Sequence, residues 1–458
     1  MADGLQQSIE KMREAGVGDA AIATFEDAYR RLRAGESGVL AESDIEPVDE
    51  VPDAAELRDD EDGAREALDH AIVLKLNGGL GTSMGMDRAK SLLEVKDGRS
   101  FLDLIAEQVL ALRASAPGSP RLPLVLMDSF ATREDSLAAL ERHEGLASDV
   151  PPDFVQNKVP KLREDDLTPV SWPAAPDLEW APPGHGDLYI ALETSGMLDA
   201  LLERGYRWAF VSNSDNLGAV LEPRILAWMA RDELPFVMEV ADRTEADRKG
   251  GHLARRTDGG LVLREVAQTP DEDLDAFQDI ARHRFFNTNN LWVDLQALRA
   301  LLDARGGVLG LPMIVNRKTV DPADKSSTPV LQLETAMGAA IDVFDGAQAL
   351  RVPRSRFLPV KTTNDLLVLR SDAYVVGDGG RVELAAGRDG APLADLDPDH
   401  FKLIADFDAR FPAGVPSLRE CERLTVAGDV AFGRGVVCRG SVRVEGPRRV
   451  EDGAVLEG

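Results

Sequence analysis

The sequence predicts an α/β protein with a mostly parallel central sheet and a short C-terminal parallel β-helix. From about residue 71, short apolar runs alternate with amphipathic helical patterns, as they do where helices cover both faces of a parallel sheet. Near the C-terminus, apolar residues recur every six positions, a period that suits a β-helix of the hexapeptide type. The two patterns therefore predict two differently built parts in one chain.

The first seventy residues are acidic, and their apolar pattern predicts helix. They hold twenty Asp and Glu but only seven Lys and Arg. Apolar residues at mostly three- and four-residue steps predict helix over residues 5–34. Residues 43–64 carry Pro47 and Pro52 among many acids, so we expect a linker or an irregular cover there. We interpret the whole segment as a solvated helical cap, to which no function can be assigned.

Strands and helices alternate after this segment. The expected strands are residues 71–76, 122–127, 208–213 and 235–240, and the expected helices are residues 101–112, 133–140, 188–202 and 224–231. Ligands bind at the carboxyl ends of the strands in such sheets. Residues 78–90 and 213–216 directly follow two of these strands, so we expect a binding site there.

A glycine-rich loop follows the first of these strands. In AIVLKLNGGLGTSMGMDRAK (71–90), the apolar run ends at Gly78 and Gly79, glycines recur at positions 81 and 85, and Lys90 closes the segment. Such a loop exposes backbone N–H groups, and the absence of side chains lets a phosphate approach them. The pattern is neither a Walker loop nor GxGxxG. It predicts a phosphate-binding loop, with an ordinary strand-to-helix turn as the alternative.

Two further segments place polar groups beside glycines or at a strand end. In PPGHGDLY (182–189), His185 lies between two glycines in a proline-fixed turn, which suits either ligand contact or a structural role. In FVSNSDNLG (210–218), the strand delivers Asn213 and Asp215 to the sheet edge. A carboxylate there suits Mg²⁺, which prefers oxygen ligands, and an Asp-Asn turn is an equal alternative.

Four weaker candidates complete the pattern. The asparagines of RHRFFNTNNLWVDL (282–295) offer donors and acceptors to sugar hydroxyls, with a turn as the alternative. We expect Glu334 at the start of a helix, where a carboxylate is favourable in any protein. We expect Lys361 at the end of a strand, and FVQNKVPKL (154–162) adds Gln156. None of these is informative alone.

The C-terminal repeat has two apolar registers. They are Leu424, Val430, Val436 and Val442, and Val426, Phe432, Cys438 and Val444. About three coils are few for independent stability, so we expect this part to dock on the main domain or on another subunit. A β-meander with coincidental spacing is the alternative.

Composition excludes several classes of protein. A chain of 458 residues is long enough for two or three domains. Its net charge of −28 argues against nucleic-acid or anionic-membrane binding through bulk electrostatics, so a phosphorylated ligand needs a local positive site. Two cysteines and six scattered histidines indicate neither a disulfide scaffold nor a zinc site. We find no signal peptide and no apolar run long enough to span a bilayer, and we expect a cytoplasmic location.

Taken together and in this order, the motifs resemble one enzyme family. LNGGLGTSMG, PPGHGD, SNSDNLGA, FNTNNLW, QLETAMGAAI and FLPVKTTNDL resemble the eukaryotic-type UTP–glucose-1-phosphate uridylyltransferases over roughly residues 70–375. The resemblance implies a Rossmann-like sheet of the nucleotidyltransferase type A, with a short left-handed β-helix at the C-terminus. It implies an acidic helical segment over 1–70, a catalytic domain over 71–375 and a C-terminal domain over 376–458.

The resemblance also implies a role for each matching position. The implied nucleotide-binding residues are Leu76, Asn77, Gly78, Gly79, Gly81, Thr82, Lys90, Gln156, Gly184, Asn213, Asp215 and Lys361. The implied sugar-phosphate-binding residues are His185, Asn213, Asn287, Asn289 and Glu334. The implied catalytic residues are Lys90, Lys361 and Asp215, with Asp215 as the ligand of Mg²⁺.

The implied reaction is uridylyl transfer from UTP to glucose 1-phosphate, with Mg²⁺ as cofactor and self-association through the β-helix left open. One departure from the family is Ala89, where proline usually precedes the loop lysine, and another is Met86, where cysteine is frequent. A broad UDP-sugar or N-acetylhexosamine 1-phosphate uridylyltransferase is the alternative within the fold. A non-catalytic nucleotide-sugar sensor and, from the hexad repeat, an acyltransferase are alternatives from other classes.

Overall fold

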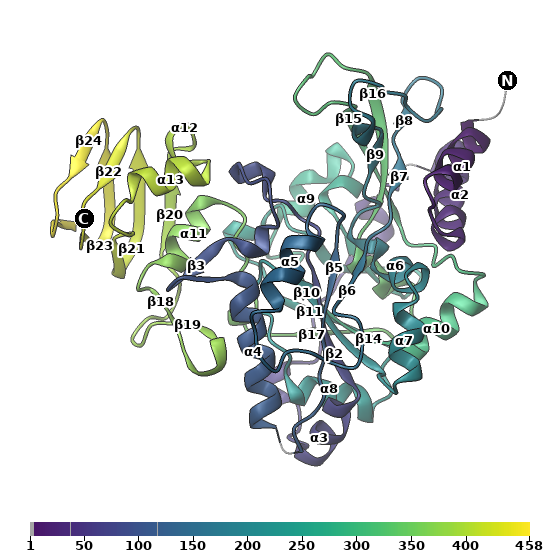
Figure 1. Ribbon diagram of the computed structural model, residues 1–458, viewed down its shortest axis with the longest axis horizontal. Coiled ribbons are helices and arrows are strands. Elements are labelled where there is room, and N and C mark those ends of the chain that lie inside the picture. Colours follow the sequence, from purple (N-terminus) through teal and green to yellow (C-terminus); the bar gives the residue numbers. More distant parts are fainter. Residues whose placement is uncertain (1–3, 37, 117) are drawn as a thin grey trace.

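The computed structural model describes residues 4–36, 38–116 and 118–458 (Figure 1). The strands of its central sheet are β1 (Ile45–Pro47), β2 (Ala71–Leu76), β5 (Leu124–Asp128), β6 (Asp153–Val155), β10 (Trp208–Asn213), β11 (Phe236–Asp242), β12 (His252–Arg256), β13 (Leu261–Arg264), β14 (Phe285–Asp294) and β17 (Gln348–Arg351). The adjacent strands β10, β2, β5 and β6 are parallel, whereas β14 runs antiparallel to β10. The prediction of an α/β fold with a mostly parallel centre is confirmed.

Helices cover both faces of this sheet. The helices of the described residues are α1 (Gly4–Glu14), α2 (Asp19–Arg33), α3 (Glu61–Asp69), α4 (Phe101–Ser115), α5 (Arg133–Leu140), α6 (Leu188–Thr194), α7 (Met197–Glu203), α8 (Pro223–Arg231), α9 (Leu274–Gln278), α10 (Leu295–Ala304), α11 (Thr363–Arg370), α12 (Pro398–Phe401) and α13 (Ile404–Arg410); α12 and α13 lie on the C-terminal part instead. Val73 packs with α3, α4 and α8, whereas its neighbours Ile72 and Leu74 pack with α6, α7 and α10. Successive strand residues point to opposite faces, so the apolar run of β2 supplies two cores.

Two predicted helices are each divided. Residues 188–202 form α6 and α7 because Gly196 adopts a left-handed backbone, with φ of 73°. Residues 5–34 form α1 and α2, with Gly16 at φ of 72° between them. In both places glycine allows the chain to leave the helix at little cost.

The acidic N-terminal segment is more than a solvated cap. The helices α1 and α2 bury Ile9, Met12 and Phe25 in a cluster with Leu331 and Leu333. The predicted linker also contributes structure, because β1 pairs with β12 at the edge of the central sheet. The acidic charge therefore covers the outer face of elements whose inner face is part of the core.

Smaller sheets surround the central one. Their strands are β3 (Glu94–Lys96) with β4 (Arg99–Ser100), β7 (Val159–Pro160) with β9 (Trp180–Ala181), β8 (Leu162–Arg163) with β15 (Met313–Thr319) and β16 (Pro329–Thr335), and β18 (Tyr374–Val376) with β19 (Val382–Leu384). The prediction that Glu334 begins a helix is wrong, because it lies in β16 opposite Ile314. Alternate residues of β16 pack against α1 and α2, which favours strand over helix.

The C-terminal part forms parallel sheets. Its strands are β20 (Leu393–Leu396), β21 (Ser417–Ala427), β22 (Val430–Phe432), β23 (Val437–Glu445), β24 (Arg448–Val450) and β25 (Val455–Glu457). Leu424 pairs with Val442 and Val430 with Arg448, each eighteen residues or three hexads further along the chain. All eight hexad residues named above are buried, as are both cysteines. The predicted β-helix and the predicted division of the chain into three domains stay predictions.

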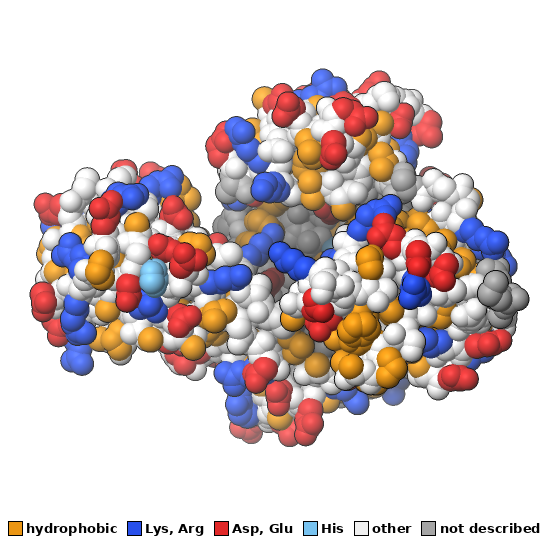
Figure 2. Space-filling view, turned by 90° about the horizontal axis from the view of Figure 1, so that it is seen from above, with side chains coloured by type: hydrophobic (Ala, Val, Ile, Leu, Met, Phe, Trp, Pro, Cys, Tyr) orange, Lys and Arg blue, Asp and Glu red, His pale blue; other side chains and the backbone are white. Residues whose placement is uncertain are grey.

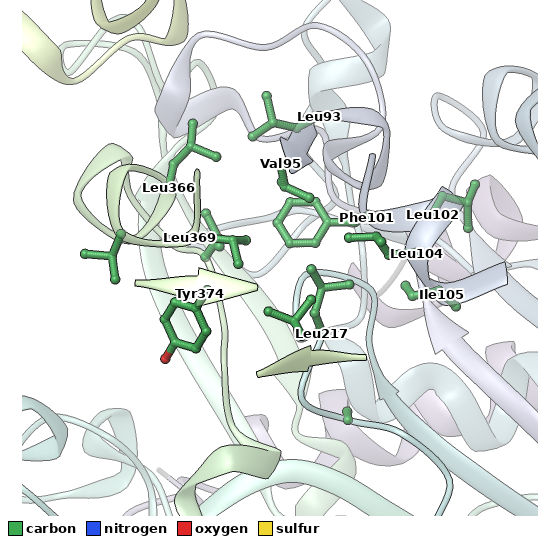
Figure 3. Packing of buried hydrophobic residues seen from close by; sticks show 14 of the residues in the cluster. Leu93, Val95, Phe101, Leu102, Leu104, Ile105, Leu217, Leu366, Leu369 and Tyr374 are labelled. Atoms are coloured by element: carbon green, nitrogen blue, oxygen red, sulfur yellow. The ribbon is translucent and has the colours of Figure 1, made fainter. Parts of the chain in front are cut away.

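One apolar cluster joins the C-terminal part to the central sheet. Figure 3 shows Leu93, Leu217 and Leu366 around Phe101 of α4, with Tyr374 at the edge of the group. Leu93, Leu217 and Leu366 follow Lys90, Asp215 and Lys361 in sequence. The cluster therefore holds the chain in place just after each of these three residues. Within the described residues, no helix combines the length and the apolar character that crossing a bilayer requires.

Candidate active site

The glycine-rich loop leaves the carboxyl end of β2 and returns over it. Gly81 and Gly85 have φ of 64° and 76°, a conformation that side chains disfavour. The N–H of Lys90 donates to the carbonyl of Gly79 at 3.0 Å and closes the loop. A Cβ added at Gly79 would meet nothing within 4 Å, so its backbone faces open space. The loop thus has the exposed backbone that the sequence predicts.

Lys90 and Asp215 meet at the sheet edge. The Lys90 Nζ donates to Asp215 Oδ2 at 2.7 Å, and their side chains are 16% and 20% exposed. Asp215 follows β10, whose last residue, Asn213, pairs with Leu76 at the end of β2. The loop lysine and the predicted metal carboxylate are therefore brought together by two adjacent parallel strands.

Lys361 lies on a loop that contacts the Asp215 loop. The prediction that it ends a strand is wrong, because it lies outside any strand and directly precedes Thr362, the N-cap of α11. Its N–H donates to the Asp365 carboxylate at 2.8 Å, and the N–H of Val360 donates to the carbonyl of Asp215 at 3.2 Å. The side chain is exposed. The second lysine thus stands on a loop fixed to the Asp215 loop.

Gln156 lies beside the start of the glycine-rich loop. A Cβ added at Gly78 would lie 2.9 Å from its Oε1, so a side chain there would displace the Gln156 amide. Asn77, by contrast, turns inward, where its Nδ2 donates to Asp128 Oδ1 and Ser136 Oγ at 2.7 Å each. Burial raises the pKa of Asp128 to about 6. The side chain of Asn77 therefore supports the loop from below.

His185 and Glu334 share a second group of candidate residues. A Cβ added at Gly184 would meet Glu334 Cβ at 3.0 Å and the carbonyl oxygen of Thr335 at 2.5 Å. His185 Nδ1 accepts the N–H of Met337 at 3.0 Å. His185 keeps solvent-accessible surface, but many protein atoms surround it, and the resulting desolvation lowers its pKa to about 4. The imidazole is therefore neutral at pH 7, with its proton on Nε2.

The asparagines of the NTNN segment lie in β14, not in a separate turn. Asn289 has φ of 59°, and its N–H donates to Asn287 Oδ1 at 2.9 Å. Asn287 Nδ2 in turn donates to Asn289 Oδ1 at 2.8 Å. The pairing of β14 with β11 shifts register between Met238 and Val240. This bulge bends the strand where sugar contacts are predicted.

The two groups are neighbours across the sheet edge. Asn157 follows Gln156 in sequence, and Asp187 lies two residues after His185. The N–H of Asn157 donates to Asp187 Oδ2 at 2.6 Å. A Cβ added at Gly338, next to Met337, would lie 2.7 Å from Asn287 Nδ2. Figure 2 views the molecule of Figure 1 from above, and it shows Lys and Arg side chains around a central hollow. The predicted residues therefore converge on one region.

The sequence interpretation missed the buried polar groups beneath this region. Glu239 in β11 is fully buried and pairs with Arg356, and Asn216 and Asn290 bond to each other at 3.2 Å. Glu265 lies near enough to Lys361 for the lysine to lower its pKa, although burial raises that pKa overall. The sequence does contain a signal for this buried carboxylate, because Glu239 is the one charged residue in the otherwise apolar run PFVMEV.

A parallel sheet with a glycine-rich loop, two lysines and a carboxylate at its carboxyl edge defines the class of nucleotide-binding α/β proteins. The UTP–glucose-1-phosphate uridylyltransferase family model matches residues 22–439. The chain belongs to this family and is a nucleotidyltransferase. Membership excludes the acyltransferase alternative.

Individual relatives cover nearly the whole chain. UTP–glucose-1-phosphate uridylyltransferase from Hordeum vulgare is 41% identical over 99% of this chain and 95% of its own length. The Saccharomyces cerevisiae protein is 42% identical over 85% of this chain and 77% of its own length. A mutant UDP-glucose pyrophosphorylase from Leishmania major, solved with UDP-glucose, has a TM-score of 0.93 and 46% identity over 100% of this chain and 98% of its own.

Proposed function

We propose that this protein transfers the uridylyl group of UTP to glucose 1-phosphate, giving UDP-glucose and pyrophosphate. The ion pair between Lys90 and Asp215 carries the proposal, because it joins the glycine-rich loop to the end of β10 beside the Lys361 loop. The names of the relatives support it, since the barley protein is a UTP–glucose-1-phosphate uridylyltransferase and the Leishmania protein was solved with UDP-glucose.

The reaction requires positive charge more than proton transfer. An oxygen of glucose 1-phosphate forms a bond to the α-phosphorus of UTP, and the bond from that phosphorus to the oxygen bridging to the β-phosphorus breaks. Pyrophosphate leaves with the electron pair. The attacking oxygen is already anionic and needs no base, so catalysis rests on positioning and electrostatic stabilisation. In a chain of net charge −28, Lys90, Lys361 and the N–H groups of the loop supply the local positive charge.

The residues present fit Mg²⁺ as cofactor. Among the described residues, no group of three His, Cys, Asp or Glu side chains could hold a metal by itself. Mg²⁺ is commonly held by one or two carboxylates together with substrate phosphates and water, so Asp215 alone suffices. When bound there, the ion neutralises charge on the phosphate oxygens. We infer that Lys90 exchanges Asp215 for a phosphate when the nucleotide binds.

The second group of residues suits the sugar phosphate. His185 Nδ1 already accepts a backbone N–H, so its Nε2 proton is available for donation. The amides of Asn287 and Asn289 and the carboxylate of Glu334 provide donors and acceptors for glucose hydroxyls. We further infer that the C-terminal sheets are coils of a β-helix, because their register advances by three hexads. Self-association through these coils and a cytoplasmic location stay predictions.

Pyrophosphate release tests the proposal directly. The purified protein is assayed with Mg²⁺ and UTP, and with glucose 1-phosphate, N-acetylglucosamine 1-phosphate or galactose 1-phosphate in turn. We expect selective release with glucose 1-phosphate and loss of release when EDTA removes the metal. Equal release with several sugars would indicate a broad UDP-sugar enzyme. No release with any sugar would contradict the proposal.

A further inference from the structure

A buried ion pair lies directly beneath the loop that carries Lys361. Glu239 in β11 is fully buried, and its two oxygens accept hydrogen bonds from Arg356 Nε at 2.8 Å and Nη2 at 2.5 Å. Asn290 Nδ2 and Trp292 Nε1 also donate to them, at 2.9 Å each. Each carboxylate oxygen thus accepts two hydrogen bonds, which fixes the direction of the guanidinium.

Arg356 is held through its backbone as well as its side chain. Its Nη1 donates to the carbonyl of Val220 at 2.9 Å. Its own carbonyl accepts from Asn216 Nδ2 and from Asn290 Nδ2, both at 3.2 Å. Val220 and Asn216 belong to the segment that follows Asp215, so Arg356 joins the Lys361 loop to the Asp215 loop.

The same connection continues toward Lys361. Asn216 Oδ1 accepts the N–H of Leu358 at 2.7 Å, and the carbonyl of Asp215 accepts the N–H of Val360 at 3.2 Å. A Cβ added at Gly218 would lie 2.4 Å from the carbonyl oxygen of Ser355, so the two loops touch backbone to backbone. The residue after Val360 is Lys361 itself. The chain of contacts therefore runs from the sheet core to the proposed catalytic lysine.

We propose that Arg356 is a positioning residue for Lys361. Through Glu239, its guanidinium holds residues 356–360 against the Asp215 loop, and this sets where Lys361 meets the phosphates of the reacting substrates. The inference rests on the proposed function and adds residues that do not touch substrate. Lysine cannot replace arginine in this role, because an ammonium lacks the planar fork that pairs with both carboxylate oxygens.

Arg356→Lys tests the inference, with Arg207→Lys as a matched control. Arg207 also pairs with a buried carboxylate, donating through Nε and Nη2 to Asp294 Oδ2 at 3.0 and 2.9 Å, but at the amino end of β10. We expect Arg356→Lys to lower kcat about ten- to a hundredfold with little change in either KM, since small displacements of a catalytic group have effects of this size. Arg207→Lys is expected to lower the melting temperature while keeping kcat.

A double variant separates positioning from general loss of structure. If Arg356 acts through Lys361, Arg356→Lys has no further effect on kcat once Lys361 is replaced by Ala. Equal effects in the two backgrounds overturn the inference, and so does an unchanged kcat in the single variant. Should Arg356→Lys fail to fold, Glu239→Gln combined with Arg356→Gln removes both charges and repeats the comparison.

A crystal structure of the Arg356→Lys variant gives a readout independent of turnover. We expect residues 357–361 to shift relative to the unsubstituted protein, and an unmoved Lys361 overturns the inference. Its failure is distinguishable from failure of the proposed function. If the unsubstituted protein releases pyrophosphate but kcat is insensitive to Arg356, only this inference fails; if it releases none, the proposed function itself fails.

Discussion

The carboxyl edge of the central sheet and the parallel sheets of the C-terminal part bury different kinds of side chain. Beneath the edge, Lys75 and Glu239 are almost or fully inaccessible, and Lys75 donates to Ser212 Oγ at 2.7 Å and to the carbonyl of Ala219 at 2.8 Å. Burial lowers the pKa of Lys75 to about 7. In the C-terminal part, by contrast, the buried hexad positions carry apolar side chains such as Val430 and Phe432.

The difference follows from what each region must do. A buried polar group is costly unless its hydrogen bonds are made, but once they are made it fixes a direction as well as a contact. Apolar packing is less directional and tolerates volume-conserving change. Under the proposed function, the edge must position Lys90, Asp215 and Lys361 relative to one another, whereas no catalytic role is proposed for the C-terminal sheets. Buried polar groups are therefore found where side chains must be positioned, and purely apolar packing is found where only stability is required.

The largest expected effect is on turnover at the edge. In the proposed function, Lys361 supplies a charge that stabilises the transferring group, so we expect Lys361→Ala to lower kcat about 10³-fold or more, as for other cationic groups in phosphoryl transfer. Steady-state pyrophosphate release measures it. Lys325→Ala, an exposed lysine of the β15–β16 connection, is the control and keeps kcat. Near-normal turnover of the Lys361 variant would remove this residue from the mechanism.

The second largest expected effect is on the stability of the C-terminal part. Phe432 is fully buried and stacks on Phe411 with ring centroids 5.0 Å apart. Phe432→Ala leaves a cavity, and we expect a loss of about 3–5 kcal/mol in the free energy of unfolding, measured by urea denaturation. We expect kcat of the folded fraction to be unchanged. A large fall in that kcat would show that the C-terminal part also affects catalysis, and the contrast between the two regions would be lost.

A smaller effect concerns pH at the edge. Asp128 is fully buried, and its raised pKa means that the folded protein binds a proton between about pH 4 and pH 6 that the unfolded chain has released. Stability therefore falls as pH rises through this window and stays lower above it. Asp128→Asn keeps an acceptor for Asn77 and removes the charge. We expect a gain of about 2–3 kcal/mol at pH 7 that disappears near pH 4.

Urea denaturation of both proteins across that pH range measures this difference. Asp153→Asn is a useful comparison, because Arg133 neutralises that carboxylate in the folded protein. We expect the Asp153 variant to be less stable at pH 7. A pH-independent difference between Asp128→Asn and the parent would contradict the assigned titration.

The smallest expected effect is at Ala89, where the family usually has proline. Its φ of −52° is one that proline adopts. We expect Ala89→Pro to raise stability by about 0.4–1 kcal/mol by restricting the unfolded chain, with kcat unchanged. Thermal unfolding gives the sign. A loss of stability would show that the buried site has no room for the ring, since Ala89 is fully buried.

Regular elements with a strong local pattern could be predicted from sequence. β2, β10 and α5 have the predicted bounds because their apolar runs or helical steps agree with their packing. Glu334 could not be placed correctly, because the strand pairing and the N-terminal helices that select its conformation are distant in sequence. The Lys361 error was avoidable: Thr362 and Asp365 form a capping box, which marks a helix start.

The candidate site was likewise predictable only in part. Its glycines and lysines stand out in local motifs, and the structure brings them to one edge of the sheet. The ion pair of Glu239 and Arg356 could not be predicted, because the partners are separated by more than a hundred residues and neither lies in a motif that suggests the other. Contacts of this kind depend on sheet order, which local patterns do not determine.

The buried cysteines of β21 and β23 have a practical consequence for labelling. Burial raises the pKa of the Cys421 thiol, and that of Cys438 to about 12. Reagents such as maleimides attack thiolates, so both native thiols are inert at neutral pH. A cysteine introduced on the exposed rim of the site is therefore the single reactive thiol. A spectroscopic probe can be attached there without first altering the native chain.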